Sequence, residues 1–491
     1  MSSHADRTGQ SKPGSMYARR ADIFPKAIDG FYRRLKWGVM AVTLAIYWIT
    51  PWIRWDRGPY APNQAVLVDL AHRRFFWFSI EIWPHEFYYV AGLLVMAGIG
   101  LFLVTATVGR AWCGYACPQT VWTDLFLHVE RWVDGDRNAQ IKLRSAPLGP
   151  GKIVKRVTKH GIWLTIAFLT GGAWCFYFTD APTLGKGLFD GSAPAVAWTT
   201  IGILTATTYV FGGWMREQVC IYMCPWPRIQ GAMLDEKSLI VTYKDWRGEP
   251  RTHGLKRAAE ESLGVEPVGD CIDCQACVQV CPTGIDIRNG PQLACITCAL
   301  CIDACDTVMA KVGRPRGLID YATFDDCEIE RKGGVPVPVR KTLLRSRTLL
   351  YFGLWGAVGV AMLISLGARV RLDISVAQDR NPLFVQLSDG SVRNAYTIKV
   401  RNMEDRPRAV RIDLAGLSGA TMWDSQQDEK RAGSALDFTV PADQIETRRI
   451  YVRAPRVGTA PANFSFRVQS RDGRPVTDTE TARFDRPEPS Q

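Results

Sequence analysis

The chain reads Cys271-Ile-Asp-Cys274-Gln-Ala-Cys277-Val-Gln-Val-Cys281-Pro282 and, shortly after, Cys295-Ile-Thr-Cys298-Ala-Leu-Cys301-Ile-Asp-Ala-Cys305-Asp306. Both segments have the spacing C-x2-C-x2-C-x3-C, which is typical of bacterial ferredoxin modules that bind two [4Fe-4S] clusters. Two-residue gaps let three thiolates converge on one cluster, and the fourth ligand comes from the other segment. This pattern predicts a two-cluster ferredoxin-like domain that carries electrons one at a time.

The spacing assigns the eight cysteines to two clusters. One set is Cys271, Cys274, Cys277 and Cys305, and the other is Cys295, Cys298, Cys301 and Cys281. Zinc is disfavoured because its sites use two C-x2-C pairs instead of a triple plus one. Disulfides are disfavoured because we expect this segment in the cytoplasm, where thiols stay reduced.

The chain has 491 residues, a length that allows two or three domains. Its formal net charge is +12. The basic residues lie beside apolar runs, which indicates contact with anionic lipid head groups and argues against nucleic acid as a partner. We expect no cleavable signal peptide, because residues 1–36 are polar and basic and the first apolar run is too long for a signal core.

Five apolar runs predict transmembrane α-helices, each of which needs about 20 residues. They are residues 37–52, 87–108, 161–178, 195–214 and 349–366. Lys and Arg residues gather before the first run, between the second and third, and before the fifth, so these segments are expected in the cytoplasm. The predicted domains are a cytoplasmic basic N-terminus (1–36), a four-helix transmembrane region (37–216), the cytoplasmic ferredoxin domain (217–346), a fifth transmembrane helix (347–368) and a periplasmic β-domain (369–491).

The C-terminal segment shows strict alternation of apolar and polar residues. Examples are residues 370–376, 396–400, 410–414 and 464–468. Period-two alternation bounded by Asp, Asn, Gly and Pro predicts half-buried strands. Strands that recur every ten to fifteen residues favour a small β-sandwich.

Two copies of a second cysteine motif, C-x3-C-P, stand where the second and fourth apolar runs end. They are Cys113-Gly-Tyr-Ala-Cys117-Pro118 and Cys220-Ile-Tyr-Met-Cys224-Pro225. A spacing of four places two sulfurs on one helix face, and the proline ends the helix. Equivalent depths would bring the four thiols together, and four soft sulfurs suit Cu(I), zinc or a further iron–sulfur cluster. Two other roles of these four cysteines stay open: they could cycle between dithiol and disulfide, or they could be inert packing residues at the helix ends.

The order of these features resembles the CcoG/FixG/RdxA family, whose members are accessory proteins for assembling cbb3-type cytochrome c oxidase. The twin C-x3-C-P motifs and the ferredoxin run also occur in NapH and NosR membrane proteins, but the C-terminal β-domain looks like the immunoglobulin-like tail of the FixG group. The resemblance implies a multi-pass protein of the bacterial inner membrane that reduces Cu(II) to Cu(I). It also implies that the catalytic copper or redox residues are Cys113, Cys117, Cys220 and Cys224. Asp306 stands where ferredoxins often have proline, which affects only the local loop.

The expected cofactors are two [4Fe-4S] clusters and a copper ion. The expected partners are the lipid bilayer, copper ions, an external electron donor, and copper ATPases, copper chaperones or oxidase assembly factors. The donor must be external because the chain has no G-x-G-x-x-G dinucleotide fingerprint. Two alternatives remain: a NapH-like, quinone-linked electron-transfer subunit that feeds a partner reductase, and a scaffold whose β-domain docks assembly factors.

Overall fold

The computed structural model describes residues 22–487, apart from 60, 252–267, 339–340, 342, 370, 405, 456–460 and 472–476. Residues 1–21 of the predicted N-terminal segment lie outside the described residues. Contacts divide the chain into two compact units. The first runs up to Pro51 and includes Leu67–Arg73 and Pro84–Gly359, and the second comprises Trp52–Val66, Arg74–Trp83 and the chain from Val360 onward.

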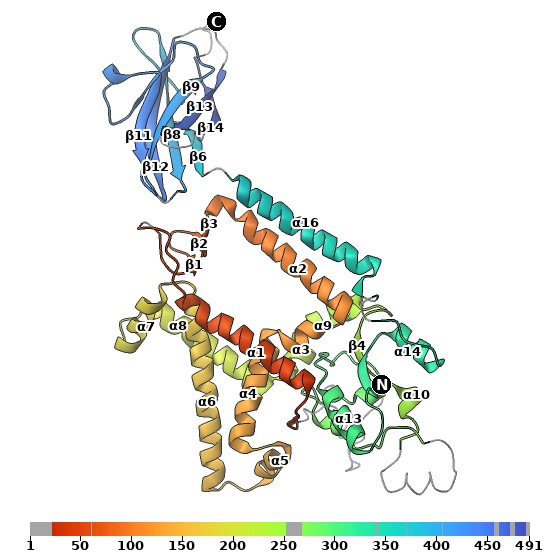
Figure 1. Cartoon of the computed structure of the whole chain (residues 1–491). Coiled ribbons are helices and arrows are strands. Elements are labelled where there is room, and N and C mark those ends of the chain that lie inside the picture. The colour runs from red at the N-terminus through yellow and green to blue at the C-terminus, as the bar shows by residue number, and fades with distance from the viewer. Residues whose placement is uncertain are drawn as a thin grey trace, which may run out of the picture. The chain divides into compact units, whose positions relative to one another are not determined.

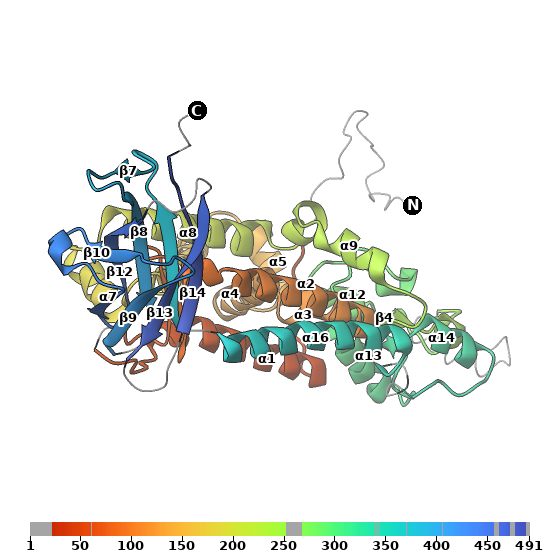
Figure 2. The same cartoon turned by 90° about the horizontal axis from the view of Figure 1, so that it is seen from above.

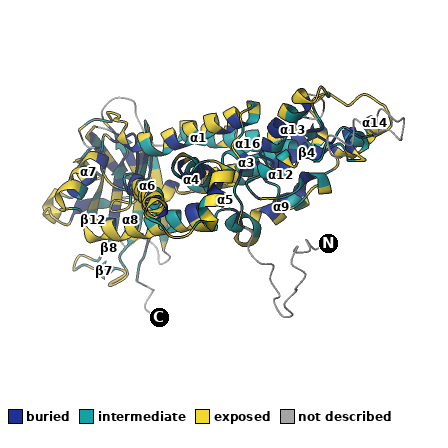
Figure 3. Ribbon diagram, turned by 90° about the horizontal axis from the view of Figure 1, so that it is seen from below, coloured by how far each residue is buried: buried dark blue, intermediate teal, exposed yellow. Residues whose placement is uncertain are grey.

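Three helical segments are long and apolar enough to cross a membrane, among the residues that the structure describes. They are Pro84–Val108, which contains α2 (Tyr88–Val108), Ala195–Met215, and Ser346–Ala368, which is α16. The segment Ala195–Met215 joins α8 (Ala195–Thr208) to a π-helix, η3 (Tyr209–Met215). Large parts of these helices are exposed, as the yellow ribbon of α8 shows in Figure 3. Their exposed apolar residues include Leu94, Val196 and Leu363. These helices identify a membrane protein and match three of the five predicted spans.

The other two predicted spans are helical but carry charged first turns. They belong to α1 (Phe31–Ile49) and α6 (Pro150–Cys175) (Figure 1). Their apolar parts, 37–49 and 161–175, are shorter than the roughly 20 residues that a perpendicular span needs. The count of five spans therefore stays a prediction.

Shorter helices connect these segments. They are α3 (Ala111–Tyr115), α4 (Pro118–Asp134), α5 (Arg137–Ser145), α7 (Ala181–Asp190), η4 (Val219–Met223, a π-helix) and α9 (Trp226–Met233). Pro118 occupies the first turn of α4, where its missing N–H costs nothing. Gly135 ends α4 with φ of 94°, a conformation that glycine adopts readily.

The cysteine-rich module lies in the first unit and is built on a two-stranded antiparallel sheet, β4 (Ile240–Tyr243) and β5 (Ile319–Ala322). Its helices are α10 (Asp245–Gly248), α12 (Ala276–Gln279), η5 (Ile287–Asn289), α13 (Leu300–Lys311) and α14 (Phe324–Arg331). Val241, Ile302, Met309 and Leu318 form a small core with the cysteines. Because the module has only two strands and short helices, the cysteine loops make up a large part of this core.

The second unit is a β-sandwich of two antiparallel sheets (Figures 1 and 2). One sheet has the order β10-β12-β8-β6 with β7 beside β8, and the other has the order β11-β9-β13-β14. The strands are β6 (Leu372–Gln378), β7 (Val385–Gln386), β8 (Val392–Asn402), β9 (Arg408–Ala415), β10 (Thr421–Asp424), β11 (Ala435–Val440), β12 (Gln444–Ala454), β13 (Ala462–Ser470) and β14 (Thr477–Phe484). Alternate residues of β8, such as Tyr396 and Ile398, are fully buried, as the alternation predicts.

The same unit contains a hairpin that precedes α2. Its strands are β2 (Arg74–Trp77) and β3 (Ile80–Ile82), paired antiparallel, and β1 (Val66–Asp69) comes before them. Arg74 forms ion pairs with Glu81, at 3.1 Å, and with Asp443 of the sandwich. This buried triad fixes the hairpin to the β-sandwich.

Candidate redox site

The two cysteine segments share an unusual backbone. Asp273 and Gln275 have φ of 48° and 56°, and the equivalent Thr297 and Ala299 have φ of 56° and 59°. Residues with a β-carbon rarely adopt this left-handed conformation, and such strain concentrates at functional sites. Its occurrence at the same two positions of each segment indicates that both loops are shaped around the same kind of group.

We call Cys271, Cys274, Cys277 and Cys305 the first cysteine group, and Cys281, Cys295, Cys298 and Cys301 the second cysteine group. In the first, burial raises the pKa of Cys305 to about 12, and the nearby Cys277, Cys271 and Cys274 raise it further. In the second, burial raises the pKa of Cys298 to about 12, with added effects from Cys281 and Cys295. Cys301 lies near Cys298, Cys295 and Cys281, but also near Cys277 of the first group, so the assignment of each thiol to one cluster stays a prediction.

These cysteine groups fit [4Fe-4S] clusters. Thiols so strongly protonated need a positive partner to become ligands, and iron supplies it with release of protons. Among the described residues, no group of three or more His, Cys, Asp or Glu side chains is arranged to hold a single metal ion. Ligation of the clusters by these eight residues stays a prediction. When bound, such clusters supply one-electron carriers.

The four C-x3-C-P cysteines also come together. Burial raises the pKa of Cys220 to about 12, and Cys117, Cys113 and Cys224 lie close enough to raise it further. The Cys113 thiol donates a hydrogen bond to the Gln230 side chain at 3.0 Å. All four are partly exposed. Among the described residues, these four cysteines are also not arranged as a site for a single metal ion.

The two copies of the motif differ in backbone. Cys113 lies on the α-helical turn α3, but Cys220 lies on the π-helix η4. The prediction of an α-helical turn is therefore wrong for the second copy, where the wider turn precedes Pro225. Isolated π-turns occur frequently at functional sites.

The first C-x3-C-P motif packs directly on the second cysteine group. A β-carbon on Gly114 would lie 2.6 Å from the Ile296 carbonyl oxygen, so only glycine allows this approach. The Tyr115 hydroxyl donates to the Cys298 carbonyl oxygen at 3.1 Å, and the Arg110 guanidinium donates to the Leu293 carbonyl oxygen. This contact could not be predicted from the sequence, because nearly two hundred residues separate the partners.

A buried charge cluster attaches α1 to the same region. Asp303 of α13 accepts hydrogen bonds from the backbone N–H groups of Tyr32, at 3.3 Å, and Arg33, at 2.8 Å. The Arg33 side chain pairs with Asp124 at 2.9 Å, and Lys36 lies 3.9 Å from the same carboxylate. Arg33 and Lys36, expected from sequence to mark the cytoplasmic side, are thus buried and ion-paired.

Comparison with protein families agrees with these features. A model of a 4Fe-4S dicluster domain matches residues 215–324, which include both cysteine groups and the second C-x3-C-P motif. A model of a 4Fe-4S binding domain matches residues 90–135, which include the first C-x3-C-P motif. The model of the IG-like fold at the C-terminus of FixG matches residues 362–487. The predicted ferredoxin-type domain and immunoglobulin-like β-domain are confirmed.

Relatives match almost the whole chain. "Nitrogen fixation protein FixG" of Rhizobium meliloti is 55% identical over 482 residues, which cover 94% of this chain and 91% of the relative. "Protein RdxB" of Cereibacter sphaeroides is 55% identical over 444 residues, which cover 90% of this chain and 91% of the relative. "Protein RdxA" of the same organism is also 55% identical, with 91% and 92% covered. The chain therefore belongs to the family of FixG, RdxA and RdxB, iron–sulfur oxidoreductases with a C-terminal immunoglobulin-like domain.

Proposed function

We propose that this protein reduces Cu(II) to Cu(I) at Cys113, Cys117, Cys220 and Cys224, and that the Cu(I) serves assembly of cbb3-type cytochrome c oxidase. The observation that carries the proposal is the contact of Gly114 with the backbone of Ile296, which puts a C-x3-C-P motif against the second cysteine group. Copper in this account is a substrate. Each Cu(II) ion takes up one electron, and a reductant outside the chain supplies it.

The chemistry of the four thiols supports this substrate. Thiolate sulfur stabilises Cu(I) over Cu(II), so binding at these residues favours reduction. Partial exposure lets an ion reach them. The Gln230 carbonyl oxygen holds the Cys113 proton until a metal replaces it.

Cysteine substitutions test this proposal. Purified protein with its clusters is mixed anaerobically with reductant, Cu(II) and a Cu(I)-specific chelator. We expect the quadruple variant Cys113→Ser, Cys117→Ser, Cys220→Ser and Cys224→Ser to retain its iron and to lose most Cu(I) formation. The matched controls Cys175→Ser and Cys327→Ser, outside both motifs, keep the wild-type rate. Equal rates in all variants would refute copper reduction at these thiols.

A quinone-linked electron-transfer subunit, which feeds a partner reductase, is the second candidate. The observation that favours it is a cavity beside Glu217, three residues before Cys220. In that case the quadruple variant loses quinol oxidation, and the wild-type protein forms no Cu(I) from reduced clusters.

A further inference from the structure

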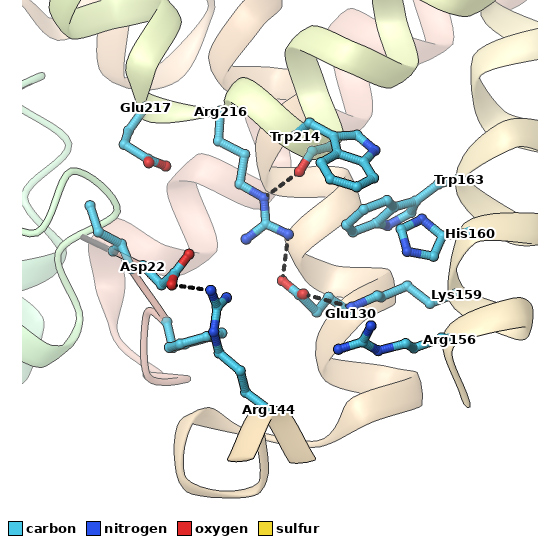
Figure 4. A pocket seen from close by; sticks show the side chains of 13 residues that line it. Asp22, Glu130, Arg144, Arg156, Lys159, His160, Trp163, Trp214, Arg216 and Glu217 are labelled. Carbon is cyan, nitrogen blue, oxygen red and sulfur yellow. Dashed lines mark hydrogen bonds and ion pairs between the residues drawn. The ribbon is translucent and has the colours of Figure 1, made fainter. Parts of the chain in front are cut away.

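A cavity of about 530 Å³ lies among α4, the first half of α6 and the end of η3 (Figure 4). This volume is within the range of small-molecule sites. The indoles of Trp163 and Trp214 and the imidazole of His160 form one wall, as Figure 4 shows. The charged lining residues are Asp22, Glu130, Arg144, Arg156, Lys159, Arg216 and Glu217.

The cations of this cavity are largely neutralised. Lys159 pairs with Glu130 at 3.0 Å, and Arg216 pairs with the same carboxylate at 2.8 Å. Arg144 pairs with Asp22 (Figure 4). Because three of the four lining Lys and Arg residues are already paired, the cavity does not favour a multiply charged anion. A neutral ligand with hydrogen-bonding groups fits better.

The wall suits a flat ring. The His160 and Trp214 rings stack at 6.0 Å with an interplanar angle of 24°, and Trp163 meets His160 edge-on at 5.2 Å. The Tyr209 hydroxyl lies 2.9 Å from His160 Nδ1, which leaves Nε2 for a ligand. Burial and the nearby Lys159 and Arg156 lower the pKa of His160, so its ring is neutral at physiological pH and can accept a proton.

The cavity lies at the end of an apolar segment that is long enough to cross a membrane. Its lining residues Gly213 and Trp214 belong to η3, the end of the apolar segment Ala195–Met215. Trp214 is 54% exposed, and tryptophan is enriched at membrane–water interfaces. A π-helix at this point is a further mark of a functional site.

The cavity also adjoins the redox thiols. Arg216 and Glu217 line it and line a neighbouring hollow that reaches Cys220 and Pro282. Glu217 is 7% exposed and stands about one helical turn before Cys220. A ligand in this cavity is therefore separated from Cys220 only by the hollow that Arg216 and Glu217 also line.

We propose that this cavity binds the ring of an isoprenoid quinol, the lipid-soluble reductant that the chain needs. The ring lies against the wall of Trp163 and Trp214. One hydroxyl of the quinol donates a hydrogen bond to His160, and the other donates to Glu217. Oxidation to the quinone releases two protons and two electrons, which balance the reduction of two Cu(II) ions to two Cu(I) ions. The use of the quinol to reduce Cu(II) rests on the proposed function, but the binding of the quinol in this cavity does not.

Photolabelling tests the site in full-length protein with its clusters, embedded in lipid nanodiscs. The probe is an azidoquinone, and decylubiquinone is the competitor. We expect the label in peptides that contain Trp163 or Trp214, and we expect decylubiquinone to remove it. Trp214→Leu and Glu217→Gln should each weaken decylubiquinone binding at least tenfold, and Trp214→Phe should restore it. The control Trp198→Leu, at a residue 40% exposed on the same apolar segment, keeps wild-type binding.

Retained iron shows that each variant is folded. A label outside the cavity, or unchanged affinity in both Trp214→Leu and Glu217→Gln, overturns the proposal. Displacement of the label by cardiolipin but not by decylubiquinone also overturns it and assigns the cavity to a phospholipid head group. Binding needs no copper, so quinone binding without copper reduction would defeat only the proposed function. Copper reduction by dithionite without quinone binding would defeat only this inference.

Discussion

The hydroxyl of Tyr115 donates a 3.1 Å hydrogen bond to the carbonyl oxygen of Cys298, and so joins a C-x3-C-P motif to a ferredoxin-type loop. Tyr321 donates to the neighbouring Thr297 carbonyl oxygen at 2.7 Å. Two hydroxyls thus hold the same left-handed turn of the second cysteine group. These hydrogen bonds fix the C-x3-C-P motif against the second cysteine group.

Gly114→Ala tests whether the junction depends on close backbone approach. The added methyl group overlaps the Ile296 carbonyl oxygen, and overpacking of this kind costs about 1–3 kcal/mol. We expect a lower unfolding temperature and loss of iron from the purified protein, measured by calorimetry and iron analysis. Gly98→Ala is the control, because a β-carbon there meets no atom within 4 Å. Equal iron content in the two variants would contradict the tight junction.

Asp124→Asn tests the buried charge cluster. Removing one partner leaves Arg33 and Lys36 buried without their counter-charge, which costs about 3–5 kcal/mol. We expect the largest loss of denaturant resistance among single carboxylate changes in this region. Asp29→Asn serves as the control, since its side chain is 89% exposed. A loss no greater than that of the control would show that the cluster adds no stability.

Asp303→Ala tests the attachment of α1 to α13. The variant removes the acceptor for the Tyr32 and Arg33 N–H groups at the start of α1, and loss of such a cap costs about 0.5–2 kcal/mol. Hydrogen exchange of the first turn of α1 should become faster. Asp303→Ser keeps a capping oxygen and should restore much of the protection, whereas equal exchange in both variants would rule out the cap.

The triad of Arg74, Glu81 and Asp443 predicts a pH dependence. Burial and then the charge of Asp443 raise the pKa of Glu81 to about 8, against an ordinary value near 4.5. The folded chain therefore binds more protons than the unfolded chain between about pH 4.5 and 8, so this contribution to stability is lost as pH rises through that interval.

Hydrogen exchange of residues 80–82 and 441–443, corrected for the intrinsic rate, measures this effect from pH 5 to 9. We expect protection to fall with pH in the wild type and to change little in Glu81→Gln. The control Glu446→Gln, at a residue with a 31% exposed side chain, keeps the wild-type dependence. Protection that rises with pH would have the opposite sign and would exclude the raised pKa of Glu81.

The sequence predicted those parts of the molecule that depend on short-range patterns of residues. The spacing of Cys271 to Cys305 predicted the ferredoxin-type domain that the family comparison confirms, and the alternation around Tyr396 predicted the strands of the sandwich. It did not predict the hydrogen bonds of Asp303 to Tyr32 and Arg33, about 270 residues away, because such contacts leave no periodic trace.

Two predictions failed or stay open for physical reasons. The second C-x3-C-P motif has α-helical spacing, but its backbone is a π-helix that only the packed chain reveals. Lys155 and Lys159 make the first half of α6 charged. The remaining apolar part is long enough for a helix packed against protein but shorter than a transmembrane span. Hydropathy alone does not separate these cases.

In the proposed function, electrons reach Cu(II) through the junction between Gly114 and the second cysteine group. The most direct measurement is stoichiometric, on anaerobic purified protein whose clusters are reduced and freed of excess reductant. Cu(II) is then added with a Cu(I)-specific chelator, while cluster absorbance and the Cu(I) complex are followed together. We expect one Cu(I) for each electron that leaves the clusters, and loss of this coupling in the quadruple cysteine variant. Clusters that stay reduced in the presence of Cu(II) would contradict it.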